Sequence, residues 1–234
     1  MFRRSVIRHG RPPDNSTNVL NLKTGKIKEI AEEGFVTPKW SPDGKYIVGG
    51  SAIDVDGLGS SIWRMNSDGG NLRKLIPSQR VGKSILSYSG SKWSPDSRKL
   101  KFVYSRMKYH WRRINHNTEA LIREEFRYFI CDHNGKTLER LNIPKDIQPI
   151  GGFDWMDNGR SLVISGVKYP INEVPPRLGE YPIRKIYKYH IATGKLTVLM
   201  DTDEYNPSGL DWISDDVLSV SPDGKKPTQW GGIK

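Results

Sequence analysis

A tryptophan-centred motif recurs four times along the chain, and this repetition constrains the fold more than any other feature of the sequence. The tryptophans are 53, 62 and 57 residues apart. The copies are Trp40-Ser-Pro-Asp-Gly-Lys45, Trp93-Ser-Pro-Asp-Ser-Arg98, Trp155-Met-Asp-Asn-Gly-Arg160 and the less regular Trp212-Ile-Ser-Asp-Asp216. Proline presets φ, aspartate can bond its own backbone, and glycine supplies the positive φ that closes a hairpin. Each copy therefore predicts a β-hairpin.

A second turn lies between successive tryptophan motifs. It is a glycine turn flanked by two short strands with apolar residues, and its copies are centred on Gly25, Gly69, Gly135 and Gly194. Two hairpins per repeat give four strands per repeat. A four-stranded antiparallel unit repeated around an axis is a propeller blade, and the repeated tryptophan is the large apolar residue that neighbouring blades pack against. The sequence thus predicts an all-β propeller.

The order of these elements resembles the WD-like propeller repeat of TolB-type proteins over roughly residues 18–225, most of the chain. The copy at Trp155 replaces Ser-Pro with Met-Asp, and the copy at Trp212 lacks the glycine, which affects the number of blades more than the fold. The resemblance implies a β-propeller that acts as a binding platform, usually bacterial and often periplasmic or extracellular. It implies no activity.

The two ends of the chain carry complementary halves of a repeat. Residues 1–17 are expected to form a basic N-terminal tail and residues 18–234 the propeller domain. The domain starts with a glycine-turn hairpin, residues 19–30, and ends with a tryptophan hairpin, residues 212–220. Joining them in one sheet would close a ring of four blades. The alternative is a fragment of a larger propeller.

The net charge of +11 is concentrated in two segments. Residues 1–12 carry +4 and residues 98–127 carry +6, so the rest of the chain is nearly neutral. Such clusters can contact phosphates, anionic lipids or an acidic protein, or form an ordinary solvated surface. The basic Met1–Gly10 segment is not followed by an apolar stretch, so no secretory signal is expected. No apolar run is long enough for a membrane span.

The residues immediately before the four tryptophans share one position on the predicted innermost strands. They are Lys39, Lys92, Asp154 and Asp211. Because side chains alternate along a strand, these four are expected to lie together near the axis. One interpretation is a polar ligand site at the mouth of the channel. The other is a set of salt bridges between blades.

The longest insertion, residues 104–127, interleaves basic and aromatic residues. Its candidate binding residues are Tyr109, His110, Trp111, Arg112 and Arg113. This composition suits phosphate contact or base stacking, but an elongated hairpin gives the same pattern, and Thr118–Phe126 could alternatively be a short helix. A proline-rich insertion, residues 167–182, occupies the same place in the next repeat. Both are expected to project from one side of the ring and to contact a protein partner there; nucleic acid is the less favoured partner.

Catalytic and cofactor motifs are not found. The histidines near the single cysteine, Cys131, lack zinc-site spacing, and one cysteine allows no internal disulfide. No cofactor or metal is predicted. The sequence favours a non-enzymatic binding or scaffolding propeller. The alternatives are a hydrolase or lyase with its site in the channel around Asp154, Asp211, Lys39 and Lys92, and a weak polyanion binder that uses the cluster around Arg112.

Overall fold

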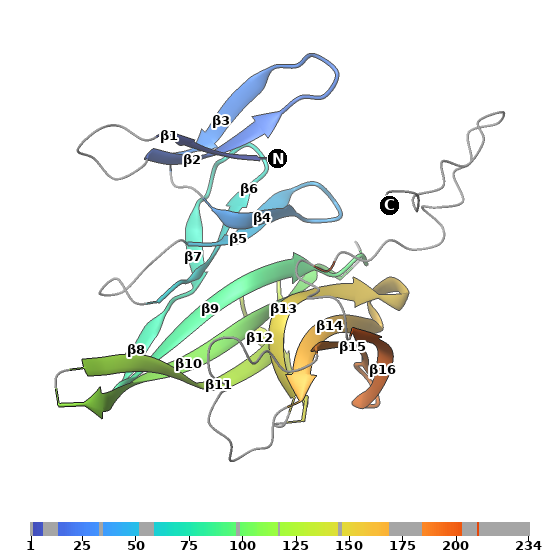
Figure 1. Cartoon of the computed structure of the whole chain (residues 1–234). Coiled ribbons are helices and arrows are strands. Elements are labelled where there is room, and N and C mark those ends of the chain that lie inside the picture. The colour runs from blue at the N-terminus through green and yellow to red at the C-terminus, as the bar shows by residue number, and fades with distance from the viewer. Residues whose placement is uncertain are drawn as a thin grey trace, which may run out of the picture.

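Four consecutive antiparallel sheets make up the part of the chain that the computed structural model describes (Figure 1). The described residues are 2–6, 14–32, 35–51, 59–96, 99–116, 118–144, 147–168, 184–202 and 210. The sheets follow one another in chain order, and each packs against the next. The architecture is all-β, in the form of a partial β-propeller, as the repeat predicts.

The first sheet has three strands in the order β1-β2-β3. They are β1 (Phe2–Val6), β2 (Asp14–Leu20) and β3 (Ile27–Ala31). The glycine turn predicted between β2 and β3 is present, with Gly25 at a φ of 68°. β1 belongs to the segment expected to be a basic tail, yet its backbone pairs with β2 from Phe2↔Asn18 to Val6↔Asp14. The first sheet is therefore one strand larger than the predicted half-blade.

The second sheet contains both predicted hairpins. Its strands lie in chain order and are β4 (Val36–Trp40), β5 (Tyr46–Gly50), β6 (Ile62–Asn66) and β7 (Arg73–Ile76). In the tryptophan hairpin, Asp43 accepts hydrogen bonds from the Ser41 hydroxyl, at 2.6 Å, and from the Lys45 amide, at 3.1 Å. These two bonds hold the pKa of Asp43 below its ordinary value, against the opposing and largest effect of desolvation. Ser-Pro-Asp-Gly thus forms the turn for the reason expected.

The third sheet is the largest, with the order β12-β11-β10-β9-β8. Its strands are β8 (Gln79–Val81), β9 (Ser84–Trp93), β10 (Lys101–Asn115), β11 (Thr118–Asp132) and β12 (Thr137–Arg140). The alternative of a helix at Thr118–Phe126 is wrong. This segment pairs with β10 along its length, so cross-strand pairing satisfies the backbone and overrides the modest helix propensity of its alanine, leucine and glutamates.

The fourth sheet repeats the pattern of the second. Its strands, again in chain order, are β13 (Ile147–Met156), β14 (Ser161–Lys168), β15 (Arg184–His190) and β16 (Lys195–Thr202). A short 3-10 turn, Asp157–Gly159, replaces Ser-Pro-Asp-Gly between β13 and β14. Asp157 fills the role of the missing turn residues, because its carboxylate accepts a hydrogen bond from Ser161 at 2.7 Å and pairs with Lys188 at 2.7 Å.

The apolar core lies between successive sheets. Trp93 packs with Val48 and Ile62 of the second sheet, and Trp155 packs with Val103 and Ile130 of the third. Between the first and second sheets the core is smaller, with Phe35, Ile47 and Met65 against Ile30 and Ala31. The repeated tryptophans at positions 93 and 155 therefore fill the gap towards the preceding sheet, as predicted.

The predicted closure of the ring is not among the contacts of the described residues. The first and fourth sheets lie at opposite ends of the arrangement, with the second and third sheets between them (Figure 1). The tryptophan hairpin at residues 212–220 lies outside the described residues. In the described part of the chain, no helix has the length and apolarity needed to cross a membrane.

The glycine turns differ in what surrounds them, which gives a direct test of how the first two sheets pack. Gly69 has a φ of 97°, and an added Cβ would collide with the carbonyl oxygen of Ile30 in the first sheet. Gly82 also has a positive φ, 60°, but nothing lies within 4 Å of its added Cβ. We expect Gly82→Ala to cost about 1 kcal/mol of unfolding free energy. Gly69→Ala should cost roughly 1–3 kcal/mol more, because the first sheet must shift. Urea denaturation measures both, and equal losses would contradict this packing.

Candidate functional site

A hydrogen bond repeated between the innermost strands joins the second, third and fourth sheets. The indole Nε1 of Trp93 donates to the carbonyl oxygen of Lys39 at 3.1 Å, and Trp155 Nε1 donates to the carbonyl oxygen of Lys92 at 2.9 Å. In both cases the acceptor is the residue immediately before the tryptophan of the preceding sheet. We call this contact the tryptophan latch. Lys39 and Lys92, two of the predicted site residues, therefore accept hydrogen bonds through their backbone carbonyl oxygens. The sequence analysis did not predict this role.

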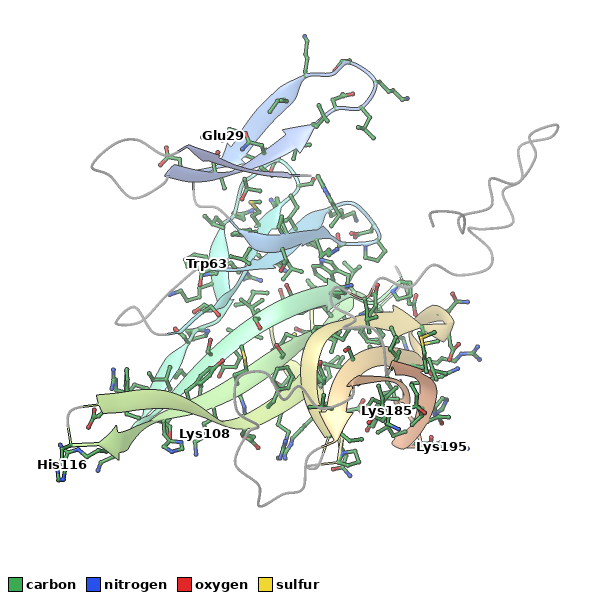
Figure 2. The ribbon with its side chains drawn as sticks, viewed as in Figure 1. Glu29, Trp63, Lys108, His116, Lys185 and Lys195 are labelled. Atoms are coloured by element: carbon green, nitrogen blue, oxygen red, sulfur yellow. The ribbon has the colours of Figure 1, made fainter. Side chains whose placement is uncertain are left out.

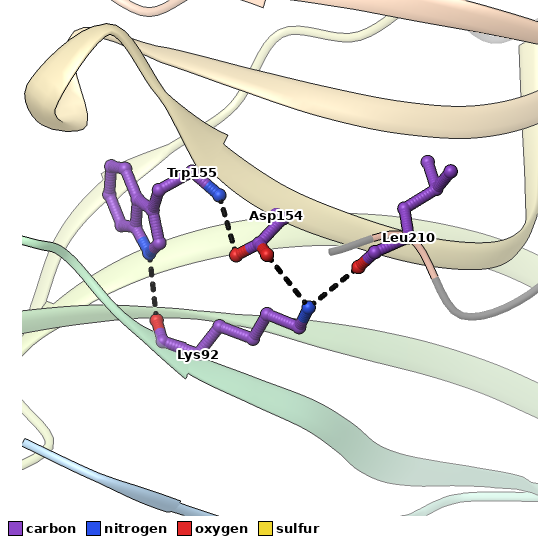
Figure 3. Close-up of polar contacts among 4 residues, drawn as sticks. All are labelled: Lys92, Asp154, Trp155 and Leu210. Carbon is purple, nitrogen blue, oxygen red and sulfur yellow. Dashed lines mark hydrogen bonds and ion pairs between the residues drawn. The ribbon is translucent and has the colours of Figure 1, made fainter. Parts of the chain in front are cut away.

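Two of the four predicted axial residues meet. Lys92 Nζ lies 3.1 Å from Asp154 Oδ2 and donates to the carbonyl oxygen of Leu210 at 2.7 Å (Figure 3). The other oxygen of Asp154 accepts a hydrogen bond from the backbone amide of Trp155 at 2.8 Å. The side chains of the pair are 17% and 19% exposed. This is the contact that salt bridges between blades would produce.

The other two predicted axial residues are Lys39 and Asp211. Lys39 contributes its carbonyl oxygen to the latch with Trp93. Asp211 lies outside the described residues. A polar ligand site formed by all four residues stays a prediction.

Serine hydroxyls, which the sequence analysis overlooked, hold β9 to its neighbours. Ser87 and Ser60 hydroxyls lie 3.1 Å apart, and the Ser89 and Ser105 hydroxyls 3.0 Å apart. The alternation of serines at positions 87, 89 and 91 was the available signal. Beside them, an added Cβ on Gly90 would lie 2.9 Å from the ring of Phe153, so β9 and β13 approach closely. Small side chains are what a crowded axis requires.

The β10–β11 hairpin extends well past the body of its sheet. Backbone pairing of β10 with β9 ends at His110↔Ser84, while pairing with β11 continues to Asn115↔Thr118. On the other side, β12 pairs only with Phe129, Ile130 and Cys131. Figure 2 shows His116 at the far end of the hairpin, away from the other sheets. The part of this insertion beyond His110, where Trp111 pairs with Leu121 and Asn115 with Thr118, is therefore a two-stranded ribbon that projects past the sheet.

The ribbon has two different faces. Strand alternation places Met107, Tyr109, Trp111 and Arg113 on one face of β10, and the Tyr109 hydroxyl donates to Met107 Sδ at 2.9 Å. Trp111 is 43% exposed. The opposite face carries Arg106, Lys108 and His110 in the same alternation. Of Arg112, the structure describes the backbone, which pairs with Ala120. The predicted binding residues are thus divided between an aromatic face and a cationic face.

Two arginines at the base of this hairpin share one internal carboxylate. Glu125 accepts from Arg106 at 2.9 Å and from Arg127 at 3.2 Å. The Arg106 guanidinium also lies 4.8 Å from the centre of the Phe129 ring. Burial lowers the pKa of Arg127 from its ordinary value, with Glu125 opposing the shift. Two of the cations in this segment therefore serve the hairpin itself.

Cys131 and His133 have surroundings that do not suit a zinc site. Cys131 is fully buried, and burial raises the pKa of its thiol well above the ordinary value. His133 stacks on Tyr46, with ring centres 5.9 Å apart. Across the residues described, no three or more His, Cys, Asp or Glu side chains are placed to hold a metal ion.

Similar architectures occur among solved structures. The chain resembles oligogalacturonate lyase from Vibrio parahaemolyticus (15% identity, 82% of this chain and 44% of that one, TM-score 0.51) and the tricorn protease (14%, 81% and 20%, TM-score 0.52). TolB from Acinetobacter baumannii is similar at 14% identity, over 80% of this chain and 38% of that one, with a TM-score of 0.47.

The likeness to the first two structures concerns the fold alone, and it agrees with the partial β-propeller formed by the described sheets. The chain spans less than half the length of each of these three proteins. No protein-family model and no curated protein matches the sequence.

The Lys92–Asp154 pair predicts a measurable coupling between the third and fourth sheets. In a double-mutant cycle with Lys92→Met and Asp154→Asn, we expect a coupling free energy of about 1–2 kcal/mol, since both side chains are largely shielded from water. The matched control is Lys185→Met with Asp201→Asn. That pair lies within the fourth sheet with side chains 35% and 55% exposed, and should couple by less than about 0.5 kcal/mol. Urea denaturation gives both values; no coupling at Lys92 would show that the pair does not join the sheets.

Proposed function

We propose that this chain is a non-enzymatic binding propeller that holds a protein partner on the aromatic face of its β10–β11 hairpin. The observation that carries the proposal is Trp111, a large side chain 43% exposed on a ribbon that projects beyond its sheet. Tyr109 and Arg113 lie on the same face. Tryptophan, tyrosine and arginine are the residues most enriched where protein interfaces gain their binding energy.

The base of the hairpin supports this role, because it holds the ribbon in one orientation. The ion pair of Arg106 with Glu125 and the position of Arg106 over the Phe129 ring cross from β10 to β11, and Arg127 pairs with Glu125 along β11. Phe126 also packs against the core between the third and fourth sheets. A preorganised ribbon loses little conformational entropy when a partner binds. The proline-rich insertion links β14 to β15, the second and third strands of the next sheet, so it is proposed to share this side; residues 169–183 lie outside the described residues.

Charge pairing favours a protein over a polyanion. Glu125 pairs with both Arg106 and Arg127, which offsets one of their two charges, and Arg113 stands opposite Glu119 in the backbone register. A polyanion binder gains affinity by releasing counterions at unpaired cations, and affinity then falls steeply with salt. An aromatic anchor gains affinity from buried apolar area, which depends weakly on salt.

The enzymatic alternative centres on Asp154. In the structure, its carboxylate is engaged by Lys92 and by the amide of Trp155. These contacts suit a structural role, and Asp154→Asn separates the two proposals: a channel enzyme would lose turnover on a pectic or peptide substrate while keeping its fold.

The test of the binding role first locates the contact on the surface and then measures how much it contributes to the affinity. A photo-crosslinking amino acid at Arg113 should capture one protein from the native cell extract, and the same probe at Lys23, on the exposed β2–β3 turn, should not. The captured protein is then purified and titrated. We expect Trp111→Ala to weaken its binding roughly 30-fold, the loss typical of an interface anchor of about 2 kcal/mol.

Leu22→Ala is the control, because Leu22 is an exposed apolar residue on a different turn. It should leave the affinity unchanged. Equal affinities for wild type and Trp111→Ala, or an affinity that falls by a factor on the order of 1,000 between low and moderate salt, would refute the aromatic-face proposal.

A further inference from the structure

Two arginines lie directly opposite each other at the outer side of the second sheet. Arg64 of β6 pairs with Arg73 of β7 in the backbone register, so both side chains stand on the same face of the sheet. β7 is the outermost strand of this sheet. Like charges that oppose each other across two strands destabilise a sheet unless a negative charge lies near both. The surroundings of this pair therefore decide whether its charge is compensated.

A neutral side chain stands between the two guanidinium groups. Arg73 Nη2 donates to Asn134 Oδ1 at 2.8 Å, and Arg64 Nη1 donates to the same oxygen at 3.4 Å. Arg64 Nη1 also donates to the carbonyl oxygen of His133 at 2.6 Å. Among the described residues, neither arginine forms an ion pair with an Asp or Glu. The amide of Asn134 thus serves two positive charges and neutralises neither.

The carboxylate of Asp132 does not fill this role. Its Oδ1 accepts hydrogen bonds from the backbone amides of Asn134, at 2.8 Å, and Lys136, at 2.9 Å, so it shapes the β11–β12 turn. Its charge raises the pKa of Arg64, but burial and then the positive charge of Arg73 outweigh it and hold this pKa below its ordinary value. The surroundings of Arg64 therefore disfavour its positive charge.

The two arginines differ in their access to water. Arg64 is 7% exposed, and its Nε is buried without a hydrogen-bond partner among the described residues. The Arg64 guanidinium lies 4.4 Å from the centre of the Tyr46 ring, so one of its faces is covered. A buried charge is screened less than an exposed one. Arg73, in contrast, is exposed. The pair therefore presents one accessible guanidinium with a second, poorly screened positive charge behind it.

We propose that Arg64 and Arg73 form a binding site for a phosphate group. A phosphate dianion carries the two negative charges that two guanidinium groups require, and its oxygens accept hydrogen bonds from several N–H groups at once. A carboxylate would offset only one of the two charges. Because Arg73 is exposed on an outermost strand, the phosphate group can be a free ion or an ester on a larger molecule.

Equilibrium dialysis of the full chain against radiolabelled inorganic phosphate, with chloride keeping the ionic strength constant, measures this binding directly. The wild type should bind phosphate saturably, with a dissociation constant on the order of millimolar. Arg73→Gln should raise this constant at least about tenfold, because it removes a charge-assisted hydrogen bond to the anion. Arg140→Gln is the matched control. Arg140 is also exposed, but it is the last residue of β12, and its loss should leave the constant unchanged.

Asn134→Asp supplies an internal carboxylate at the oxygen that both arginines share. It should weaken phosphate binding roughly tenfold or more, because the new charge competes with the anion. It should also raise the midpoint of thermal unfolding in chloride buffer by about 2–4 °C, since the arginine pair is then compensated. A purely structural contact of the arginines with Asn134 would be stabilised in the same way, but its wild type would bind no phosphate.

Competition with other anions identifies the group that is bound. Displacement of the labelled phosphate by glycerol 2-phosphate supports a site for phosphate esters, and displacement by unlabelled inorganic phosphate alone supports a site for the free ion. Acetate should compete at least about tenfold more weakly than phosphate, because it carries one charge. The proposal is overturned if the wild type binds no phosphate saturably, if Arg73→Gln binds as well as the wild type, or if acetate competes as well as phosphate.

Discussion

The contact between one innermost strand and the next is the interaction on which the rest of this structure depends. A four-stranded sheet has two faces, and no sheet in this chain can bury both of them alone. The tryptophan latch solves this with one side chain, which fills the apolar gap towards the preceding sheet and donates its polar N–H to that sheet's backbone. An indole buried without this acceptor would lose part of what its ring gains.

A second set of contacts ties the sheets together further from the axis. Arg64 of β6 is buried, lies 4.4 Å from the centre of the Tyr46 ring, and donates to the carbonyl oxygen of His133 at 2.6 Å. Asn134 accepts from Arg73 at 2.8 Å. Burial lowers the pKa of Arg64, with the positive charge of Arg73 as the next cause. The β11–β12 turn is thus held on the second sheet by arginines, so inner and outer contacts together fix the angle between two sheets.

Local sequence predicted the hairpins well and the long-range contacts poorly, for a physical reason. Turn residues act within four or five positions, so Ser-Pro-Asp-Gly and the glycine turns could be read directly. β1 has no such signal: its strand exists because β2 offers an edge, and only the pairing reveals it. The same holds for the axial residues. Lys39, Lys92, Asp154 and Asp211 occupy equivalent positions in the repeat, so the sequence suggested one ring of four charges. Which charges pair depends on the spacing between the sheets. That spacing brings Lys92 to Asp154.

The division between a repeated scaffold and one enlarged hairpin explains where the charge lies. The latch and the serine contacts use neutral side chains or backbone groups, and the carboxylates of Asp154 and Asp157 are paired with Lys92 and Lys188, so these contacts add little net charge. The excess of basic residues is concentrated in residues 98–127, and the part of this segment beyond His110 extends past the pairing of β10 with β9. Trp111 and Trp40 illustrate the consequence. Each is a partly exposed tryptophan, but Trp111 lies on the projecting end of β10 in the third sheet and Trp40 at the end of β4 in the second. The two belong to different sheets, so substitutions at them should act independently.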